Sequence, residues 1–203
     1  MKLYNAPLPA PNPRRVRIFL AEKGVTVPMM DIAIMKREHK SREHLARNSL
    51  GQVPTLELDD GTTISETVAI CRYFEGLHPA PPMFGKDAFE QAMVDQWVRR
   101  VEFAVMTPVG MFWRHAHPFT AALVVQHKEF GESNRALYEK AVRWLDGELK
   151  GREFLATGDY TVADICLLST IDFAAWIGLA VPEGMANVRA WHERASARPS
   201  AKA

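Results

Sequence analysis

The chain has 203 residues, of which 47% are hydrophobic and 24% charged, as is typical of a soluble globular protein with a substantial core. Its 25 Lys and Arg residues balance 24 Asp and Glu residues, so no overall field attracts nucleic acid or an anionic membrane. No apolar run could cross a bilayer and the first residues do not resemble a signal peptide, so we expect a cytoplasmic protein that binds neither nucleic acid nor membrane.

The first third of the chain alternates between short strands and helices. Strand-forming runs are expected at 2–5, 27–34, 55–58 and 62–65, and helical patterns at 13–23, at 41–49 and after residue 65. The Asp-Asp-Gly turn at 59–61 is the strongest hairpin signal in the chain. The expected order is strand, helix, strand, helix, two antiparallel strands, helix, an α/β layer large enough to fold by itself.

Two of these helices carry recognisable start signals. Asn12 suits the N-cap of the first helix, with Pro13 as its first helical residue and Gly24 just past its end. Ser65 suits the N-cap of the third helix. The buried face of that helix would be formed by Ile70, Tyr73, Phe74 and Leu77.

Prolines interrupt this pattern between 78 and 87, and helical periods dominate afterwards, at 88–107, 120–149, 161–177 and 185–197. A glycine at 131 would split or kink the second of these helices, and Thr161 with Asp164 forms a capping box that we assign to folding. Cys71 and Cys166 fall in apolar helical patterns and are expected as inert core thiols. We therefore expect an N-terminal domain at 1–78, a linker at 79–86 and an all-helical domain at 87–203.

Four stretches of the chain resemble the cytosolic glutathione S-transferases: KLY…RRVRIFLAEKG, EHKSREHLARNSLGQVPTLELDDGTTISETVAI, YTVADICLLSTID and WHERASARPS. Together they reach across nearly the whole chain, and the second is long and ungapped. The resemblance, to a bacterial member, implies a thioredoxin-like α/β N-terminal domain (β-α-β-α-β-β-α) followed by an all-α helical-bundle domain. It also implies glutathione as co-substrate, no metal, and a homodimer.

The resemblance implies that Gln52, Val53 and Pro54 contact glutathione. The proline is cis in the family, and Val53 pairs there with the cysteinyl part of glutathione. An extended residue before a proline exposes its amide and carbonyl for such pairing, although a plain turn into a strand is the alternative reading.

Two charged ends of glutathione need their own sites. Glu66 and Thr67 open a helix whose unpaired N–H groups suit the γ-glutamyl carboxylate, with Glu66 facing the ammonium. Alone, this stretch would be only a cap and a first-turn acid. His39 and Lys40 would meet the glycyl carboxylate, or they form a solvated charge run.

The family's catalytic Ser or Cys falls at Ala10, which cannot donate, and Tyr4 lies within the strand, where a core role is expected. Asn12 remains. A nu-like group of the family carries Thr-Pro-Asn here, and this chain keeps Pro-Asn after an alanine. The hypothesis is that Asn12 and the first-turn amides around Arg14 stabilise the glutathione thiolate; the alternative for Asn12 is a pure N-cap.

The electrophile would bind between the two layers. Its candidate pocket residues are Leu8, Pro9, Met106, Met111, Phe112 and His115. Met and aromatic residues at helical spacing are equally typical of core packing. His115 and His117 form a His-x-His pair, which we interpret as pocket-lining or solvated histidine rather than as a metal site.

The predicted activity is that of a glutathione transferase: attack of the thiolate on a hydrophobic electrophile, or thiol exchange with a disulfide, with disulfide reductase or peroxidase activity as variants. The alternative is a non-catalytic module that binds glutathione or a protein. Ala10 favours the module, whereas the Gln-Val-Pro and Ser-Glu-Thr stretches favour retained glutathione binding.

Overall fold

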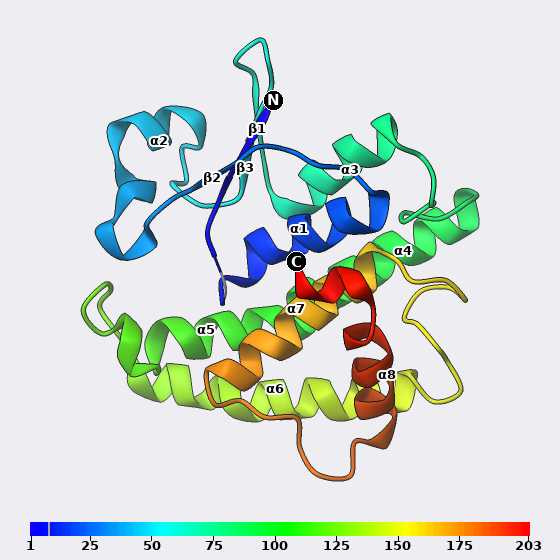
Figure 1. The fold of residues 1–203 in the computed structure, drawn as a ribbon. Helices are drawn as coiled ribbons and strands as arrows, with labels where there is room; N and C mark the ends of the chain where they lie inside the picture. Colours follow the sequence, from blue (N-terminus) through cyan, green and yellow to red (C-terminus); the bar gives the residue numbers. More distant parts are fainter. Residues whose placement is uncertain (8) are drawn as a thin grey trace. The chain divides into compact units, whose positions relative to one another are not determined.

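A computed structural model describes residues 1–7 and 9–203 (Figure 1). The chain forms two compact units, the N-terminal unit (Met1–Met83 with Pro199–Ala203) and the helical unit (Phe84–Arg198). The last five residues, expected in the helical domain, therefore pack with the first unit. The domain boundaries at 78, 79, 86 and 87 stay a prediction.

The N-terminal unit contains a mixed sheet of four strands in the order β2-β1-β3-β4. The strands are β1 (Lys2–Asn5), β2 (Met29–Asp31), β3 (Thr55–Glu57) and β4 (Thr63–Ser65). β1 pairs with β2 in parallel, and β3 pairs with both β1 and β4 in antiparallel fashion, so the expected hairpin is confirmed. β2 is shorter than expected because the chain turns into a 3₁₀ helix at Ile34–Lys36.

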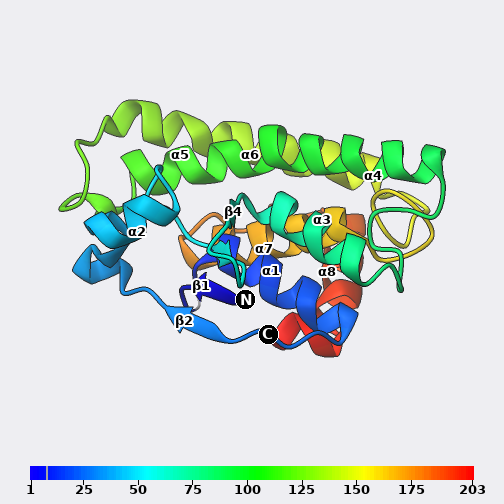
Figure 2. The same cartoon turned by 90° about the horizontal axis from the view of Figure 1, so that it is seen from above.

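Three α-helices pack against this sheet: α1 (Pro11–Lys23), α2 (Arg42–Arg47) and α3 (Thr67–Leu77). Figures 1 and 2 show α1 and α3 together on one side of the strands and α2 on the other. Val16, Phe19 and Leu20 form the buried stripe of α1, as their spacing predicts. On α3 the buried face consists of Thr67, Ile70, Cys71 and Phe74.

That face of α3 differs in part from the prediction. Leu77 is 49% exposed and Tyr73 is half-buried, because α3 ends at Leu77 and its last turn leaves the core. Cys71 and Cys166 are buried and neither forms a disulfide, as expected.

Two helix starts also differ from the prediction. α1 begins at Pro11 with Ala10 as its N-cap, because Pro11 itself occupies a first-turn position that suits proline. Asn12 therefore lies inside the first turn, and the prediction that it is the N-cap is wrong. Ser65 is not an N-cap either: it pairs with Thr55 as the last residue of β4. The N-cap of α3 is Glu66.

Both ends of α1 are tied to other segments of the N-terminal unit. The Arg14 guanidinium donates to the carbonyl of Ala201, 2.9 Å away, in the 3₁₀ helix Pro199–Lys202. At the other end, Gly24 terminates α1 in the left-handed conformation, as predicted, and the buried Lys23 ammonium lies 2.6 Å from the Glu75 carboxylate of α3. These contacts join the C-terminal residues, α1 and α3 into one layer.

The helical unit consists of helices joined by loops. These are α4 (Ala88–Arg100), a π-helical stretch (Val101–Met106), α5 (Thr107–His115), a 3₁₀ helix (Pro118–Thr120), α6 (Lys128–Glu148), α7 (Val162–Trp176) and α8 (Ala186–Ser196). α5 and α6 run side by side in both ribbon views.

α6 begins at Lys128 rather than at residue 120, which the sequence pattern predicted. The preceding loop is fixed differently: the Gln126 side-chain amide donates to the His117 carbonyl at 2.8 Å. Gly131 neither splits nor ends α6. A Cβ there would come within 2.7 Å of the backbone of His115 and Ala116, so glycine permits the close approach of α5 and α6.

The capping box of α7 is confirmed and belongs to a larger buried network. The Asp164 carboxylate accepts hydrogen bonds from the Thr161 N–H and hydroxyl (3.0 and 3.1 Å), the Leu155 N–H (3.0 Å) and the Trp191 indole N–H (2.9 Å). Burial raises the pKa of Asp164, although these donors oppose the shift. One side chain thus connects the loop before α7, α7 itself and α8.

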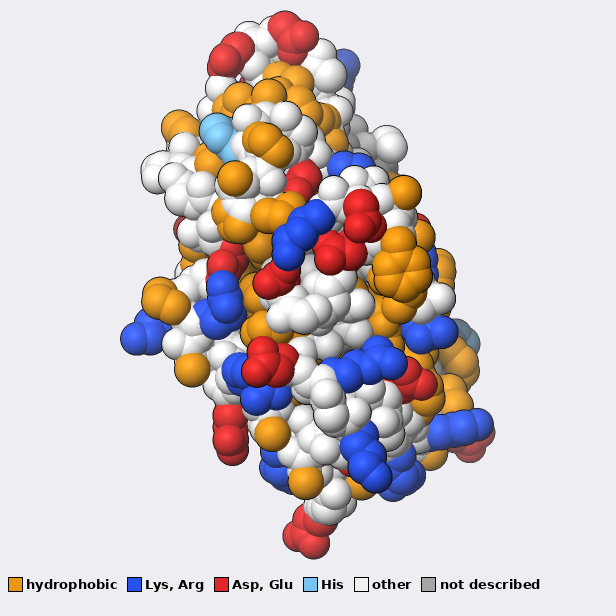
Figure 3. All heavy atoms as spheres, turned by 90° about the vertical axis from the view of Figure 1, so that its right-hand side faces the viewer, with side chains coloured by type: hydrophobic (Ala, Val, Ile, Leu, Met, Phe, Trp, Pro, Cys, Tyr) orange, Lys and Arg blue, Asp and Glu red, His pale blue; other side chains and the backbone are white. Residues whose placement is uncertain are grey.

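The surface shows no dominant charge on the face drawn in Figure 3, where Lys and Arg side chains are interspersed with Asp and Glu. Among residues 1–7 and 9–203, no helix combines the length and the apolarity needed to span a membrane.

Replacement of Asp164 by Ala should lower the free energy of unfolding by about 3 kcal/mol or more, because several buried donors lose their acceptor together. Urea denaturation followed by circular dichroism measures this. Asp159→Ala is the matched control: its carboxylate is 60% exposed and forms a salt bridge with an exposed lysine, Lys86, so we expect a change within about 0.5 kcal/mol. Equal losses in the two variants would contradict the structural role of Asp164.

Candidate functional site

The strand register brings three separate segments to one edge of the sheet. Tyr4 of β1 pairs with Thr55 of β3, and Thr55 pairs with Ser65 of β4. Because both pairings are antiparallel, the end of β1, the start of β3 and the end of β4 lie next to one another. The segments that follow β1 and β4 and the segment that precedes β3 (6–7, 66–67 and 51–54) therefore meet at this edge, which we call the site edge, and α1 begins at Pro11 after the first of them.

The loop before β3 is fixed by a buried polar cluster. The Val53–Pro54 peptide bond is cis, as the resemblance implied. The Gln52 carbonyl accepts from His44 Nε2 (2.8 Å), Asn48 Nδ2 (3.1 Å) and Thr55 Oγ1 (3.3 Å). These three side chains are at most 5% exposed. These buried donors thus hold the Gln52 carbonyl, and with it the loop, in place.

Sequence reasoning missed this cluster. His44 lies in Ser-Arg-Glu-His-Leu-Ala-Arg, where charged neighbours are typical of a solvated helix. The one available signal was Ser41, which caps α2 by accepting the His44 N–H at 3.1 Å and so fixes which residues of this short helix face inward.

His39 and Lys40 lie against the same loop. Gly51 has a φ of +58°, and a Cβ there would come within 2.7 Å of the His39 carbonyl and 2.9 Å of the Lys40 side chain. The Lys40 ammonium donates to the Leu50 carbonyl at 2.8 Å. Burial lowers the pKa of His39, and Lys40 lowers it further, so His39 is neutral at pH 7. A neutral imidazole and an ammonium are therefore available beside the loop.

The start of α3 offers main-chain donors to an anion. Its first intrahelical bond runs from the Ile70 N–H to the Glu66 carbonyl, which leaves the N–H groups of Thr67, Val68 and Ala69 without helical acceptors. Among the described residues, no side chain caps this end. Glu66 has a φ of +69°, a conformation that costs a non-glycine residue about 1–3 kcal/mol and that is common at functional sites.

The start of α1 offers fewer donors. Pro11 and Pro13 have no N–H, and the Arg14 N–H bonds to the Ala10 carbonyl at 3.4 Å. Within the described part of the turn, the Asn12 N–H is the main-chain donor that remains. The Asn12 side-chain oxygen is buried and has no hydrogen-bond partner among the described residues. The NH₂ group of the same amide is a donor, so it can form a hydrogen bond to an anionic ligand.

The segment before α1 is fixed by Arg17, whose guanidinium donates to the Asn5 side chain (2.7 Å) and to the Ala6 carbonyl (2.9 Å). Tyr4 takes the expected core role: it is buried and its hydroxyl donates to Glu57 at 2.9 Å. The phenol is therefore committed within the sheet.

Comparison with known proteins matches this arrangement. The family model described as "Glutathione S-transferase, N-terminal domain" matches residues 1–76, and "Glutathione S-transferase, C-terminal domain" matches residues 106–199.

The chain belongs to the glutathione S-transferase family.

A full-length relative is "Glutathione S-transferase 2" of Saccharomyces cerevisiae, 38% identical over all of this chain and 88% of the relative. The crystal structure of Gtt2 from Saccharomyces cerevisiae matches with a TM-score of 0.93 and 37% identity over 100% of this chain and 99% of that chain. A glutathione S-transferase domain-containing protein of Marinobacter aquaeolei VT8 matches with a TM-score of 0.92 and 34% identity over 98% and 99% of the two chains. The predicted fold class, a thioredoxin-like domain followed by a helical bundle, is confirmed.

The residues predicted for the transferase's electrophile pocket differ in their surroundings. Leu8 lies outside the described residues, and Pro9 is exposed in the N-terminal unit. In the helical unit, Met106 and Met111 are half-buried. Phe112 is 4% exposed with the Arg135 guanidinium 4.7 Å above its ring, an arrangement that favours core packing.

The histidines near the end of α5 have fixed tautomers. His115 Nδ1 accepts the His127 N–H and His117 Nδ1 accepts the Phe119 N–H, each at 3.3 Å. The neutral rings therefore carry their proton on Nε2, where they can donate. Among the described residues, no group of three His, Cys, Asp or Glu side chains is arranged to bind a metal ion.

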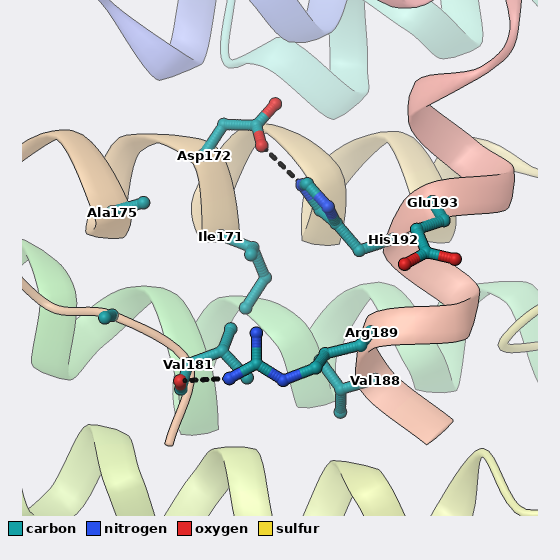
Figure 4. Close-up of a pocket in the computed structure, with 9 residues that line it drawn as sticks. Ile171, Asp172, Ala175, Val181, Val188, Arg189, His192 and Glu193 are labelled. Carbon is teal, nitrogen blue, oxygen red and sulfur yellow. Dashed lines mark hydrogen bonds and ion pairs between the residues drawn. The ribbon is translucent and has the colours of Figure 1, made fainter. Parts of the chain in front are cut away.

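A separate pocket of about 360 Å³ lies between α7 and α8 of the helical unit (Figure 4). Asp172 and His192 point toward one another there, 2.6 Å apart, and Ser196 Oγ lies 3.5 Å from the same imidazole nitrogen, Nε2. A Ser-His-Asp triad requires the serine and the carboxylate on opposite ring nitrogens, so this group is not one. Arg189 is bonded to the Val181 and Pro182 carbonyls.

Replacement of Gly51 by Ala should lower the free energy of unfolding more than Gly61→Ala does. The difference should be about 1–3 kcal/mol, the usual cost of overpacking. Both glycines have positive φ, but a Cβ at Gly61 meets nothing within 4 Å, so the difference isolates the contact with His39 and Lys40. Urea unfolding of both variants measures it. Equal losses would show that the loop does not depend on this close approach.

Proposed function

We propose that this glutathione S-transferase binds glutathione along the site edge, lowers the pKa of its thiol at the start of α1, and transfers the glutathionyl group to a hydrophobic electrophile. The observation that supports the proposal is the strand register, because it places the end of β1, which leads toward α1, beside the start of β3 and the end of β4, the neighbours of Val53 and Thr67 in the chain. A tripeptide with two carboxylates, an ammonium and a thiol needs separated partners of this kind.

Each part of glutathione has a chemically suitable partner. Val53 would pair its main chain with the cysteinyl part beside Gln52 and Pro54, in the manner of an added strand. The uncapped N–H groups of α3 suit the γ-glutamyl carboxylate, and the Glu66 carboxylate suits its ammonium. His39 and Lys40 suit the glycyl carboxylate.

The thiol then needs stabilisation as an anion. A free thiol has a pKa of about 8.5, and lowering it by about two units requires about 2.7 kcal/mol in favour of the thiolate. A helix N-terminus supplies about 0.3–1 kcal/mol at an exposed site. One hydrogen bond to a charged group adds about 1.5–3 kcal/mol, so the Asn12 N–H and side-chain amide together suffice.

The thiolate attacks an electrophilic carbon, forms the C–S bond and displaces a leaving group or adds to a double bond. With a disulfide it attacks sulfur and releases the second thiol. We propose a hydrophobic small molecule as the electrophile. A homodimer and a cytoplasmic location complete the proposal, by analogy with the family.

Replacement of Asn12 by Ala should raise the pKa of the bound glutathione thiol by about one unit, because one donated hydrogen bond of about 1.5 kcal/mol is lost while the main-chain N–H remains. The thiolate absorbance as a function of pH measures this. Asn12→Asp is nearly isosteric but adds a negative charge, so its thiol pKa should be higher still. An unchanged pKa in Asn12→Ala would remove the side chain from the proposal.

Replacement of Glu66 by Gly should increase the free energy of unfolding by about 1 kcal/mol, because it relieves backbone strain. It should also weaken glutathione binding about tenfold or more, because the carboxylate that faces the ammonium is lost. Calorimetry and urea unfolding measure the two effects. Arg37→Gly is the matched control, since Arg37 is the other described non-glycine residue with positive φ (58°). It should gain stability without losing affinity. If both variants bind glutathione as the parent does, Glu66 does not contact the ligand.

A further inference from the structure

We propose that His44 is a positioning residue: its buried imidazole orients the Gln52–Val53 peptide so that the Val53 N–H points out to the ligand. The proposal rests on the assigned role of Val53 in glutathione binding and extends it to a residue that does not touch glutathione.

The protonation of His44 follows from its partner. Nε2 lies 2.8 Å from the Gln52 carbonyl oxygen, which can only accept, so Nε2 carries a hydrogen. Nδ1 is buried and has no hydrogen-bond partner among the described residues, and a proton there would have no acceptor. The arrangement therefore requires the neutral Nε2–H tautomer. The ring is further fixed by an edge-on contact with Tyr4, with 6.0 Å between centroids.

The Gln52 carbonyl has an unusual number of donors. His44 makes the shortest bond, and Asn48 Nδ2 (3.1 Å) and Thr55 Oγ1 (3.3 Å) share the same oxygen. A carbonyl oxygen has two lone pairs, so three donors leave it no freedom to rotate away. Asn48 is itself fixed, because its side-chain oxygen accepts the Leu50 N–H at 3.1 Å.

The orientation of this carbonyl determines what the loop presents outside. A trans peptide is planar, with its C=O and N–H pointing in opposite directions. The Gln52–Val53 bond is not among the cis bonds of the described chain. Since the Gln52 carbonyl points to the buried donors, the Val53 N–H points away from them, toward the exposed side of the loop. His44 thus controls a main-chain donor without being near the ligand.

The bond to the Val53 N–H would form equally in the ground state and in the transition state. Interactions of that kind change KM and leave kcat unchanged. A residue with only a structural role would instead lower stability and the fraction of active protein, with no change in KM.

The test is His44→Phe, which keeps the ring and its contact with Tyr4 but removes the donor. The Gln52 carbonyl retains two donors, so we expect a melting temperature close to that of the parent. KM for glutathione should rise about three- to tenfold with kcat within about twofold, as expected for one net hydrogen bond.

His44→Gln carries an amide donor at a similar reach and should restore KM. His78→Phe is the matched control, because His78 is an exposed histidine of the same unit.

Amide hydrogen exchange of a peptide covering residues 48–53 gives a second readout that needs no glutathione. It should be faster in His44→Phe than in the parent and in His44→Gln. If the parent protein itself binds no glutathione in calorimetry, the proposed function fails, and this exchange experiment still decides the role of His44. An unchanged KM together with unchanged exchange in His44→Phe would overturn the proposal. So would a lower kcat and melting temperature with KM unchanged.

Discussion

The antiparallel pairing of β3 with both β1 and β4 is the constraint on which the candidate site depends. It makes neighbours of three positions distant in sequence: the end of β1, which leads toward α1, the start of β3 next to Val53, and the end of β4 next to Thr67. The other features of the site belong to one segment, or to the loop before β3 and the residues that pack directly against it. Without this register, Pro54, Glu66 and the start of α1 would not belong to one site. A slip of one residue would turn the side chains of β3 to the opposite face of the sheet.

The start of α1 has fewer free main-chain N–H donors than most helix N-termini. A helix normally exposes several N–H groups at its N-terminus, which attract water and any anion. In α1, Pro11 and Pro13 remove two of them and the Arg14 N–H is bonded to Ala10. The main-chain donor that remains in the described turn belongs to the residue whose side-chain amide is also available. Because Ala10 has no hydroxyl, the start of α1 has few hydrogen-bond donors, and those that remain in the described turn belong to Asn12.

Much of the fold follows from the sequence, and the failures have identifiable causes. The order of strands and helices, the Asp-Asp-Gly hairpin and the α7 capping box were predictable because each depends on local chemistry. The start of α1 was not, because Pro11 and Pro13 both suit the first turn and both follow residues that can precede a helix. Ser65 is a good N-cap by composition, but pairing with Thr55 keeps it in the strand. His44 was missed because its burial depends on a loop that folds over α2, which no periodicity reveals.

In the proposed complex, the three segments of the site edge share one further property: each would offer main-chain N–H groups to glutathione. These donors belong to the backbone, so they are present whatever side chain each residue carries, in addition to the side-chain contacts proposed for Asn12 and Glu66. What must be specified is the direction in which each peptide points, and that direction is fixed from the buried side. In the loop before β3, His44, Asn48 and Thr55 do this through a single carbonyl. The proposed recognition of glutathione therefore depends on buried residues that orient the chain beneath the ligand as well as on the residues that touch it.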